Sequence, residues 1–230
     1  MLLIVSPEEK YINDLLLKFD YNKKNNLNNI NLYSCNYKSH QFLIATTGYG
    51  KVNIASSLIN ILNNYPIKVI LLIGTAGSID NKNDIFNAVI FNKAVQYDVD
   101  FSPIGYDVGV IPKMNNLYYE VNDDIKGALQ RSSIACGISY TNDLIASADM
   151  FVNNINLSNS IKEEYNAGAV DAESGVVGQF CYMNNISYAG IKIISNFAHN
   201  MAAKQYKLYD DKASLIAQKI TYKFIREYYY

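Results

Sequence analysis

Continuous apolar runs alternate along the chain with segments of helical spacing. Runs at 41–47, 68–73, 84–91 and 188–195 have the length and composition of strands buried on both faces. The segments 52–65 and 174–185 repeat apolar residues at helical spacing, and 212–230 is a long amphipathic helix. A shorter apolar run at 2–5 leads to Pro7, which opens a helix-like segment ending near Tyr21. The Asn- and Lys-rich stretch 22–31 is expected to be a surface loop.

Strands that are apolar on both faces and alternate with helices indicate a sheet covered on each side. We therefore expect the α/β class, as a three-layer α/β/α sandwich with a central mixed, mostly parallel sheet. No repeat, linker or shift in composition divides the 230 residues, so we expect a single domain over 1–230.

The composition of the chain limits the classes of partner and ligand that we expect. The formal net charge is -1, and the two arginines, Arg131 and Arg226, form no basic stripe, which argues against a nucleic-acid partner. No apolar run approaches the roughly 18–20 residues of a membrane span, and the start lacks a signal-peptide pattern, so we expect a cytoplasmic protein. The three cysteines are far apart and no histidine-rich pairing accompanies them, so neither a zinc site nor a disulfide framework is expected. We expect no metal and no organic cofactor.

Two glycine-rich stretches follow predicted strands: Gly48-Tyr49-Gly50-Lys51 and Gly74-Thr75-Ala76-Gly77. Either could be a plain turn, but ligands of open α/β sheets bind at the carboxyl ends of the strands. Glu173 lies among small residues before a helix, where it either complements the helix dipole or grips two adjacent sugar hydroxyls. Ser195 and Asn196 are a polar pair where the last predicted strand ends, either as the start of a loop or as part of a site, and His199 follows as a weaker candidate.

Taken together, these segments resemble the nucleoside phosphorylase and nucleosidase superfamily. The residues 47–55 and 73–78 are similar to its first two fingerprints. The pieces 97–100, 104–109 and 111–112 are similar to a segment of 5′-methylthioadenosine/S-adenosylhomocysteine nucleosidases. The stretches 147–152, 170–173 and 193–196 resemble the base-stacking, ribose-binding and catalytic segments of that family. The opening residues and the Ile-Ser-Asn ending of the last strand also resemble futalosine hydrolases.

The resemblance implies a role for each matching position. Ala76 and Gly77 would lie near the ribose and the nucleophilic water, and Phe151 would stack on the purine. The backbone of Val152 would meet the base edge. Ala172 and Glu173 belong to the ribose-binding segment, in which Glu173 would bind the 2′- and 3′-hydroxyls. Ile104 and Pro112 would complete the 5′ pocket of a neighbouring subunit, which implies a homodimer.

Two positions depart from the family pattern. Tyr11 stands where the family has a water-activating glutamate; Glu8 and Glu9 lie slightly earlier, and Glu9 is our candidate. Asn196 stands where adenine nucleosidases have an aspartic acid, whose protonation of N7 an amide cannot supply. An amide does match the O6 acceptor and N7–H donor of a 6-oxopurine, so we expect a substrate such as inosine or futalosine. We expect Ser195 to orient the amide of Asn196.

The nucleophile and the activity itself leave alternatives. Family phosphorylases surround phosphate with arginines, but neither arginine here is near a site motif, so we expect hydrolysis; Lys51 or backbone N–H groups remain as phosphate ligands. A 5′-methylthioadenosine/S-adenosylhomocysteine nucleosidase, a phosphate-dependent phosphorylase and a non-catalytic purine-binding protein are the other candidates.

Overall fold

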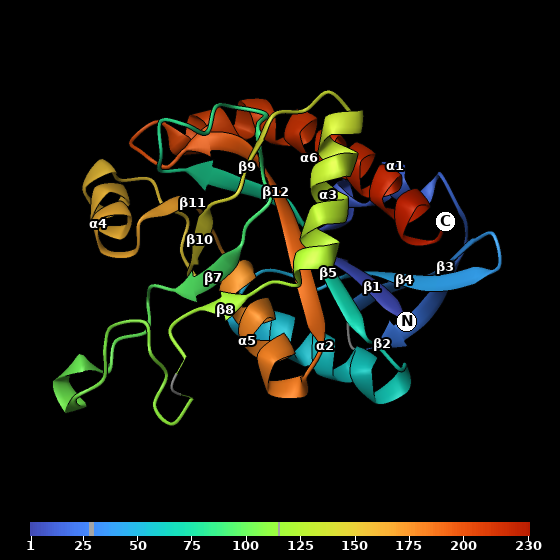
Figure 1. Cartoon of the computed structure of the whole chain (residues 1–230), viewed down its shortest axis with the longest axis horizontal. Helices are drawn as coiled ribbons and strands as arrows, with labels where there is room; N and C mark the ends of the chain where they lie inside the picture. The colour runs from blue at the N-terminus through green and yellow to red at the C-terminus, as the bar shows by residue number, and fades with distance from the viewer. Residues whose placement is uncertain (28–29, 115) are drawn as a thin grey trace.

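The apolar runs become neighbouring strands of one mixed sheet in the computed structural model, which describes residues 1–27, 30–114 and 116–230 (Figure 1). The strands are β1 (Leu2–Ser6), β2 (Asp20–Leu27), β3 (Ile30–Tyr37), β4 (His40–Thr46), β5 (Val69–Ser78), β6 (Ala88–Val89), β7 (Lys93–Gln96), β8 (Tyr119–Glu120), β9 (Tyr140–Thr141), β10 (Leu144–Ser147), β11 (Ala167–Asp171) and β12 (Ser187–Phe197). The helices are η1 (Glu9–Tyr11), α1 (Asn13–Leu16), α2 (Lys51–Asn64), η2 (Ser102–Ile104), α3 (Asp123–Ala135), α4 (Ile155–Tyr165), α5 (Ser174–Asn184) and α6 (Ala202–Tyr228). Strand β5 lies at the centre, because it pairs with β1, β11 and β12.

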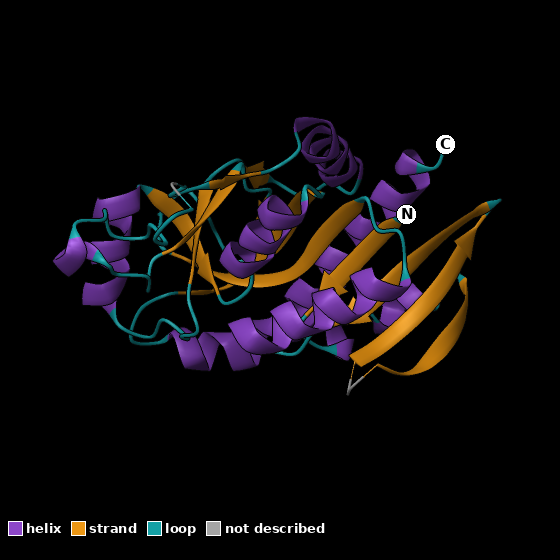
Figure 2. Cartoon of the chain, turned by 90° about the horizontal axis from the view of Figure 1, so that it is seen from below, coloured by secondary structure: helices purple, strands orange, loops and turns teal. Residues whose placement is uncertain are grey.

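Consecutive residues of the central strands face opposite layers. Leu2 and Ile4 of β1 pack into a core shared with α1, α3 and α6, whereas Leu3 and Val5 pack into a core shared with α2 and α5. Because side chains alternate along a strand, such a strand must be apolar at every position. Figure 2 shows helices on both sides of the sheet, so the predicted three-layer α/β/α fold is confirmed.

The centre of the sheet is parallel and its edges are antiparallel. Strands β4, β1, β5 and β12 pair in parallel, as do β7, β10 and β11. The two parallel groups join through the antiparallel pairing of β5 with β11. The β2–β3 and β3–β4 pairs are also antiparallel. The carboxyl ends of β5, β11 and β12 therefore meet near one junction, where the candidate site lies.

The strongest sequence patterns correspond to observed elements. The runs at 41–47 and 188–195 are β4 and β12, and the helical segments at 52–65 and 174–185 are α2 and α5. The final helix is also present, but α6 begins at Ala202 rather than at 212. Its first turns carry mostly polar, exposed residues, which hid its start from a hydrophobic pattern.

Three further predictions are wrong. The run at 84–91 contains only the two residues of β6, because the chain turns at Phe86, whose φ is 72°. The helix expected after Pro7 is interrupted into η1 and α1 and ends at Leu16. The loop expected over 22–31 falls mostly in β2 and β3, with residues 28–29 outside the described ranges. As an edge strand, β2 is held by backbone hydrogen bonds to β3 and can carry exposed polar side chains.

The second glycine-rich stretch is part of a strand rather than a turn. Strand β5 continues through Gly74 and Gly77 to Ser78, where it reaches β11. A Cβ on Gly77 would lie 2.8 Å from Asn196 Oδ1 and 3.2 Å from Ala198 Cβ. Glycine is therefore needed here for the close approach of β5 and β12, not for an unusual φ.

Within the described parts of the chain, no helix combines the length and the apolar character needed to cross a membrane.

Candidate active site

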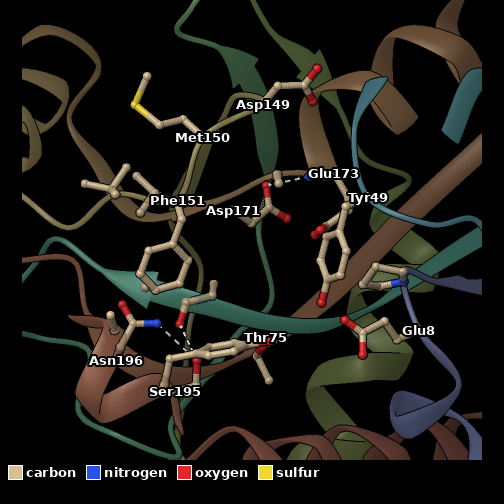
Figure 3. Close-up of a pocket in the computed structure, with 18 of the residues that line it drawn as sticks. Glu8, Tyr49, Thr75, Asp149, Met150, Phe151, Asp171, Glu173, Ser195 and Asn196 are labelled. Atoms are coloured by element: carbon tan, nitrogen blue, oxygen red, sulfur yellow. Dashed lines mark hydrogen bonds between the residues drawn. The ribbon is translucent and has the colours of Figure 1, made fainter. Parts of the chain in front are cut away.

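A cavity of about 690 Å³ opens beside the carboxyl ends of β5, β11 and β12, and Figure 3 shows the side chains around it. Eight of the residues predicted from the sequence line it: Ala76, Gly77, Phe151, Val152, Ala172, Glu173, Ser195 and Asn196. They come from four separate segments of the chain, which the sheet junction brings together. The other three predicted residues, Glu9, Ile104 and Pro112, do not line this cavity.

Two carboxylates at the carboxyl end of β11 share one buried cation. Lys192 of β12 is fully buried, with its Nζ 3.0 Å from Asp171 Oδ2 and 2.5 Å from Glu173 Oε2. Asp171 also accepts hydrogen bonds from the N–H and Oγ of Ser174, at the start of α5. Burial raises the pKa of Glu173, opposed by the charge of Lys192 and reinforced by that of Asp171. With two acids and one base, this group favours a ligand that donates hydrogen bonds to Glu173.

The sequence carries a signal for Lys192, although Lys192 was not among the predicted site residues. It lies in the middle of the apolar run at 188–195, and the residues on either side of it are buried strand residues. A lysine that must be buried requires acidic partners, because an unpaired buried charge is too costly. That rule indicates a buried ion pair, but it does not identify the partners.

Ser195 and Asn196 both line the cavity although they are consecutive residues of a strand. In a regular strand their side chains would point to opposite faces. The pairing register of β12 with β5 shifts between Ile194 and Asn196, which leaves Ser195 as an extra residue in a bulge. Asn196 Nδ2 donates a hydrogen bond to Ser195 Oγ at 3.2 Å (Figure 3), so Ser195 fixes the orientation of the amide.

Aromatic side chains form the opposite walls of the cavity. Figure 3 shows Phe151 beside Asn196, with Tyr49 across the cavity. The ring of Phe151 is half exposed and meets the ring of Tyr206 edge-on, with centroids 5.6 Å apart. An apolar ring that remains accessible beside a buried amide suits a flat, polar-edged ligand.

Of the three N-terminal candidates, Glu8 and Tyr11 line the cavity and Glu9 does not. The carboxylate of Glu9 accepts a hydrogen bond from the Tyr33 hydroxyl and lies 3.8 Å from Lys23 Nζ. It therefore faces β2 and β3 instead. The structure does not support Glu9 as a group that touches a ligand in this cavity, because η1 turns its side chain to the other side of the chain.

A third buried carboxylate lies against Tyr11 and was absent from the sequence-based candidates. The Tyr11 hydroxyl donates to Asp210 of α6, and Thr75 and Lys10 also contact this carboxylate. Tyr11 and Asp210 are far apart in the chain, and no motif surrounds Asp210. Only the packing of α6 on η1 brings them together.

The turn at 48–51 is a true strand-to-helix connection, but its anion-binding groups are already engaged. The N–H of Lys51, at the start of α2, donates to Asp149 Oδ1 at 2.9 Å. Lys51 Nζ pairs with Asp98 Oδ1 at 2.6 Å. Neither Arg131, which pairs with Glu227, nor Arg226 lines the cavity. The only basic side chain among its described lining residues is Lys207, which is exposed.

Ile104 and Pro112 belong to a long connection between β7 and β8. Ile104, at the end of η2, is 70% exposed. Figure 1 shows this green segment extending away from the sheet and its covering helices. Neither residue lines the cavity of its own chain.

Neither histidine lines the cavity: His40 stacks on Tyr229, and His199 stacks on Phe197. Among the residues that the structure describes, no three histidine, cysteine, aspartate or glutamate side chains form a group suited to a metal ion.

Comparison with known proteins identifies the family to which the chain belongs. The sequence matches the Phosphorylase superfamily over residues 2–227. A relative, the 5′-methylthioadenosine/S-adenosylhomocysteine nucleosidase of Staphylococcus aureus, is 24% identical over 219 residues, which cover 94% of each chain. The chain therefore belongs to the Phosphorylase superfamily.

Solved structures show the same fold at low identity. Futalosine hydrolase of Helicobacter pylori superposes with a TM-score of 0.93 at 21% identity, covering 98% of this chain and 97% of that one. A mutant of the H. pylori 5′-methylthioadenosine/S-adenosylhomocysteine nucleosidase, solved with 5′-methylthioadenosine in its active site, gives the same TM-score and identity, with 98% of each chain covered.

Proposed function

We propose that this protein is a purine nucleosidase, which hydrolyses the N-glycosidic bond of a purine nucleoside and acts on a 6-oxopurine. The observation that carries the proposal is the cavity that joins a buried carboxylate, an accessible aromatic ring and a buried, oriented amide: Glu173, Phe151 and Asn196. The names of the relatives, which are nucleosidases and a futalosine hydrolase, support the reaction class.

The lining residues that the sequence predicted each have a role in this proposal. Glu173 accepts hydrogen bonds from the 2′- and 3′-hydroxyls of the ribose, and its neighbour Ala172 leaves room for the sugar. Phe151 stacks on the base, whose edge meets the backbone of Val152. Ala76 and Gly77 lie beside the ribose and the water. Positive charge that develops on the ribose as the bond stretches is stabilised by the acidic Asp171–Glu173 group.

The choice of a 6-oxopurine rests on hydrogen-bond complementarity at Asn196. One N–H of its amide is used by Ser195 Oγ, which leaves the second N–H and Oδ1 for a ligand. The N–H matches the O6 acceptor of the base, and Oδ1 matches a protonated N7. Adenine would present an amino donor at the same position, opposite the amide N–H. Asn196 is 3% exposed, so a mismatch would leave a polar group unpaired in a buried position.

Water is the proposed nucleophile because the anion-binding groups beside the cavity are already engaged. The N-terminus of α2 is occupied by Asp149, and Lys51 is paired with Asp98. Glu8, Asp149 and Glu173 line the same space, and carboxylates there would repel a phosphate dianion.

The projecting β7–β8 connection suggests how the site is completed. We propose a homodimer in which Ile104 and Pro112 reach the 5′ side of the partner's cavity. The exposure of Ile104 on an extended segment supports this arrangement. A single catalytic domain working in the cytoplasm is the accompanying proposal.

The deciding experiment is product analysis by chromatography. Purified protein is incubated with inosine, futalosine and 5′-methylthioadenosine, each with and without phosphate. We expect hypoxanthine to be released without phosphate. Release only with phosphate would make the protein a phosphorylase. Saturable purine binding without release from any of the three would favour a binding protein.

A substitution tests the Asn196 argument separately. Asn196→Asp should shift preference toward 5′-methylthioadenosine by about 10²-fold or more, because it restores a group able to protonate N7 of adenine. Asn200→Asp makes the same chemical change at an exposed position outside the cavity and should leave the preference as it is. Efficient release of adenine by the unaltered protein would refute the 6-oxopurine assignment while keeping the nucleosidase class.

A further inference from the structure

A buried carboxylate lies directly behind the wall of the cavity. Asp210 of α6 is 3% exposed and does not line the cavity itself. The Tyr11 hydroxyl lies 3.1 Å from Asp210 Oδ1 and 3.0 Å from Oδ2, and Thr75 Oγ1 donates to Oδ1 at 2.5 Å. Tyr11 and Thr75 do line the cavity, and their hydroxyl oxygens are 3.2 Å apart. Two hydroxyl groups therefore connect the buried carboxylate with the ligand space.

The charges of this group are balanced. Lys10 Nζ lies 2.7 Å from Asp210 Oδ2 and 3.0 Å from the Tyr206 hydroxyl. Burial alone would lower the pKa of Lys10, but its contacts with Asp210 and Tyr206 raise it above the usual value. Burial and the nearby charge of Asp210 raise the pKa of Tyr11, so the tyrosine keeps its proton at neutral pH. The resting group is thus a lysine cation, a carboxylate and a neutral phenol.

We propose that Asp210 receives, through the hydroxyl of Tyr11, the proton that the attacking water loses in the hydrolysis proposed above. This inference rests on that proposed function. It accounts for the tyrosine at the position where the family resemblance expects a glutamate: the carboxylate is supplied from α6 instead. In this proposal the Tyr11 hydroxyl contacts the attacking water, so Tyr11 is the catalytic residue and Asp210 acts through it.

Atoms and charges balance in this transfer. The C1′–N9 bond breaks and its electron pair leaves with the purine, while the water oxygen forms a bond with C1′. The water gives one proton to the Tyr11 oxygen as the Tyr11 hydroxyl gives its own to Asp210. The purine takes a proton from solvent water at N7, and Asp210 returns its proton to solvent after the products leave. No tyrosinate is formed, which agrees with the raised pKa of Tyr11.

Glu8 is the competing base, since it also lines the cavity. Its side chain is 43% exposed, and its carboxylate lies 3.7 Å from Lys10 Nζ. Asp210 is held by three donors, from Tyr11, Thr75 and Lys10, and is shielded from water. A group fixed in this way is better oriented for transfer than a side chain that is partly in solvent.

The test compares kcat and KM of Asp210→Asn and Tyr11→Phe with those of the unaltered protein. We expect kcat to fall by about 10²-fold or more in each variant, because general-base catalysis is worth about that much. KM should change by no more than a few-fold, since neither residue is proposed to hold the substrate. Asp211→Asn is the matched control: it makes the same change at the next, exposed position of α6 and should retain activity. Purine binding and the melting temperature report folding.

A relocated carboxylate provides the sharper measurement. Adding Tyr11→Glu to the Asp210→Asn variant returns an acid to the cavity wall and should restore kcat by about 10-fold or more. A purely structural role for Asp210 predicts no such recovery, because the double variant is further from the native packing. If Asp210→Asn does not fold, Tyr11→Phe alone decides, since it removes a single oxygen.

The outcomes separate this inference from the proposed function. Unaltered protein that releases no base from any of the three nucleosides overturns the proposed function and this inference with it. Active protein whose Asp210→Asn and Tyr11→Phe variants keep their kcat overturns the inference alone. A large loss in Glu8→Gln with none in Asp210→Asn would place the base on Glu8 and also overturn it.

Discussion

Two groups of charged side chains flank the cavity, and they differ in burial and in charge. The strand triad consists of Asp171, Glu173 and Lys192, and the helix cluster consists of Lys10, Tyr11 and Asp210. In the strand triad one fully buried lysine faces two carboxylates. In the helix cluster a lysine that is 32% exposed faces one buried carboxylate, which hydroxyl groups also contact. The strand triad thus has more acidic than basic groups and is buried from solvent. The helix cluster pairs one lysine with one carboxylate and is partly exposed to solvent.

This difference suits different tasks. A net negative, water-excluded group can stabilise positive charge that develops nearby, because its field is weakly screened. A neutral group linked to the cavity through hydroxyls can accept a proton without creating a second buried charge of the same sign. The two lysines offer the most direct way to break the comparison.

Lys192→Met should cause the largest loss of stability. It leaves two carboxylates buried without a counter-charge, and breaking a buried ion pair from one side costs about 3–5 kcal/mol. The free energy of unfolding, measured by urea titration at neutral pH, should fall by that amount.

Lys10→Met is the comparison variant for this measurement. Asp210 would keep hydrogen bonds from Tyr11 and Thr75, so we expect a smaller loss of about 1–2 kcal/mol. Equal losses in the two variants would contradict the distinction between a buried strand triad and a partly exposed helix cluster.

Asp171→Asn should change the pH dependence of stability. The folded protein holds a proton on Glu173 at pH values where the unfolded chain, in which a glutamate has its ordinary pKa of 4.5, has lost it. Stability therefore falls as pH rises from about 4.5 toward the raised pKa of folded Glu173. The charge of Asp171 contributes to that rise, so removing it should lower the pKa of Glu173. Unfolding titrations at about pH 5 and about pH 7 should show a smaller fall in the variant than in the unaltered protein.

Asp171→Asn should also change the pH dependence of kcat/KM. Protonated Glu173 accepts hydrogen bonds poorly, so kcat/KM should rise with pH through the pKa of this group. In Asp171→Asn the acid limb of that profile should move to lower pH. An unmoved limb would mean that another group controls it.

The two groups also differ in how far the sequence alone could reveal them. Asp171 and Glu173 lie in one short segment whose resemblance to a ribose-binding motif is local, and β12 follows soon after. Lys10 and Asp210 belong to no motif and meet only because α6 packs on η1. A contact between distant residues leaves no trace in either local pattern, so the helix cluster could not be predicted.

The fold shows the same division. Strands β4 and β12 were predictable because burial on both faces makes them continuously apolar. Strand β2 was not, because an edge strand needs only backbone partners and its residues at 21–23 are exposed. The bulge at Ser195 also escaped prediction, since it depends on the register of β12 against β5.

Glu9→Gln should have the smallest effect, although Glu9 was our candidate base from the sequence. Its carboxylate faces Tyr33 and Lys23, outside the cavity, and an exposed ion pair contributes at most about 1 kcal/mol. We expect kcat to stay within about two-fold of the unaltered value, because general-base losses of about 10²-fold arise only where the group reaches the reacting water. A loss of that larger size, with an unchanged melting temperature, would show that η1 rearranges when substrate binds. The site would then include both Glu9 and Lys10, which are adjacent in the chain. The helix cluster would have to include the Glu9 carboxylate of η1 as the base.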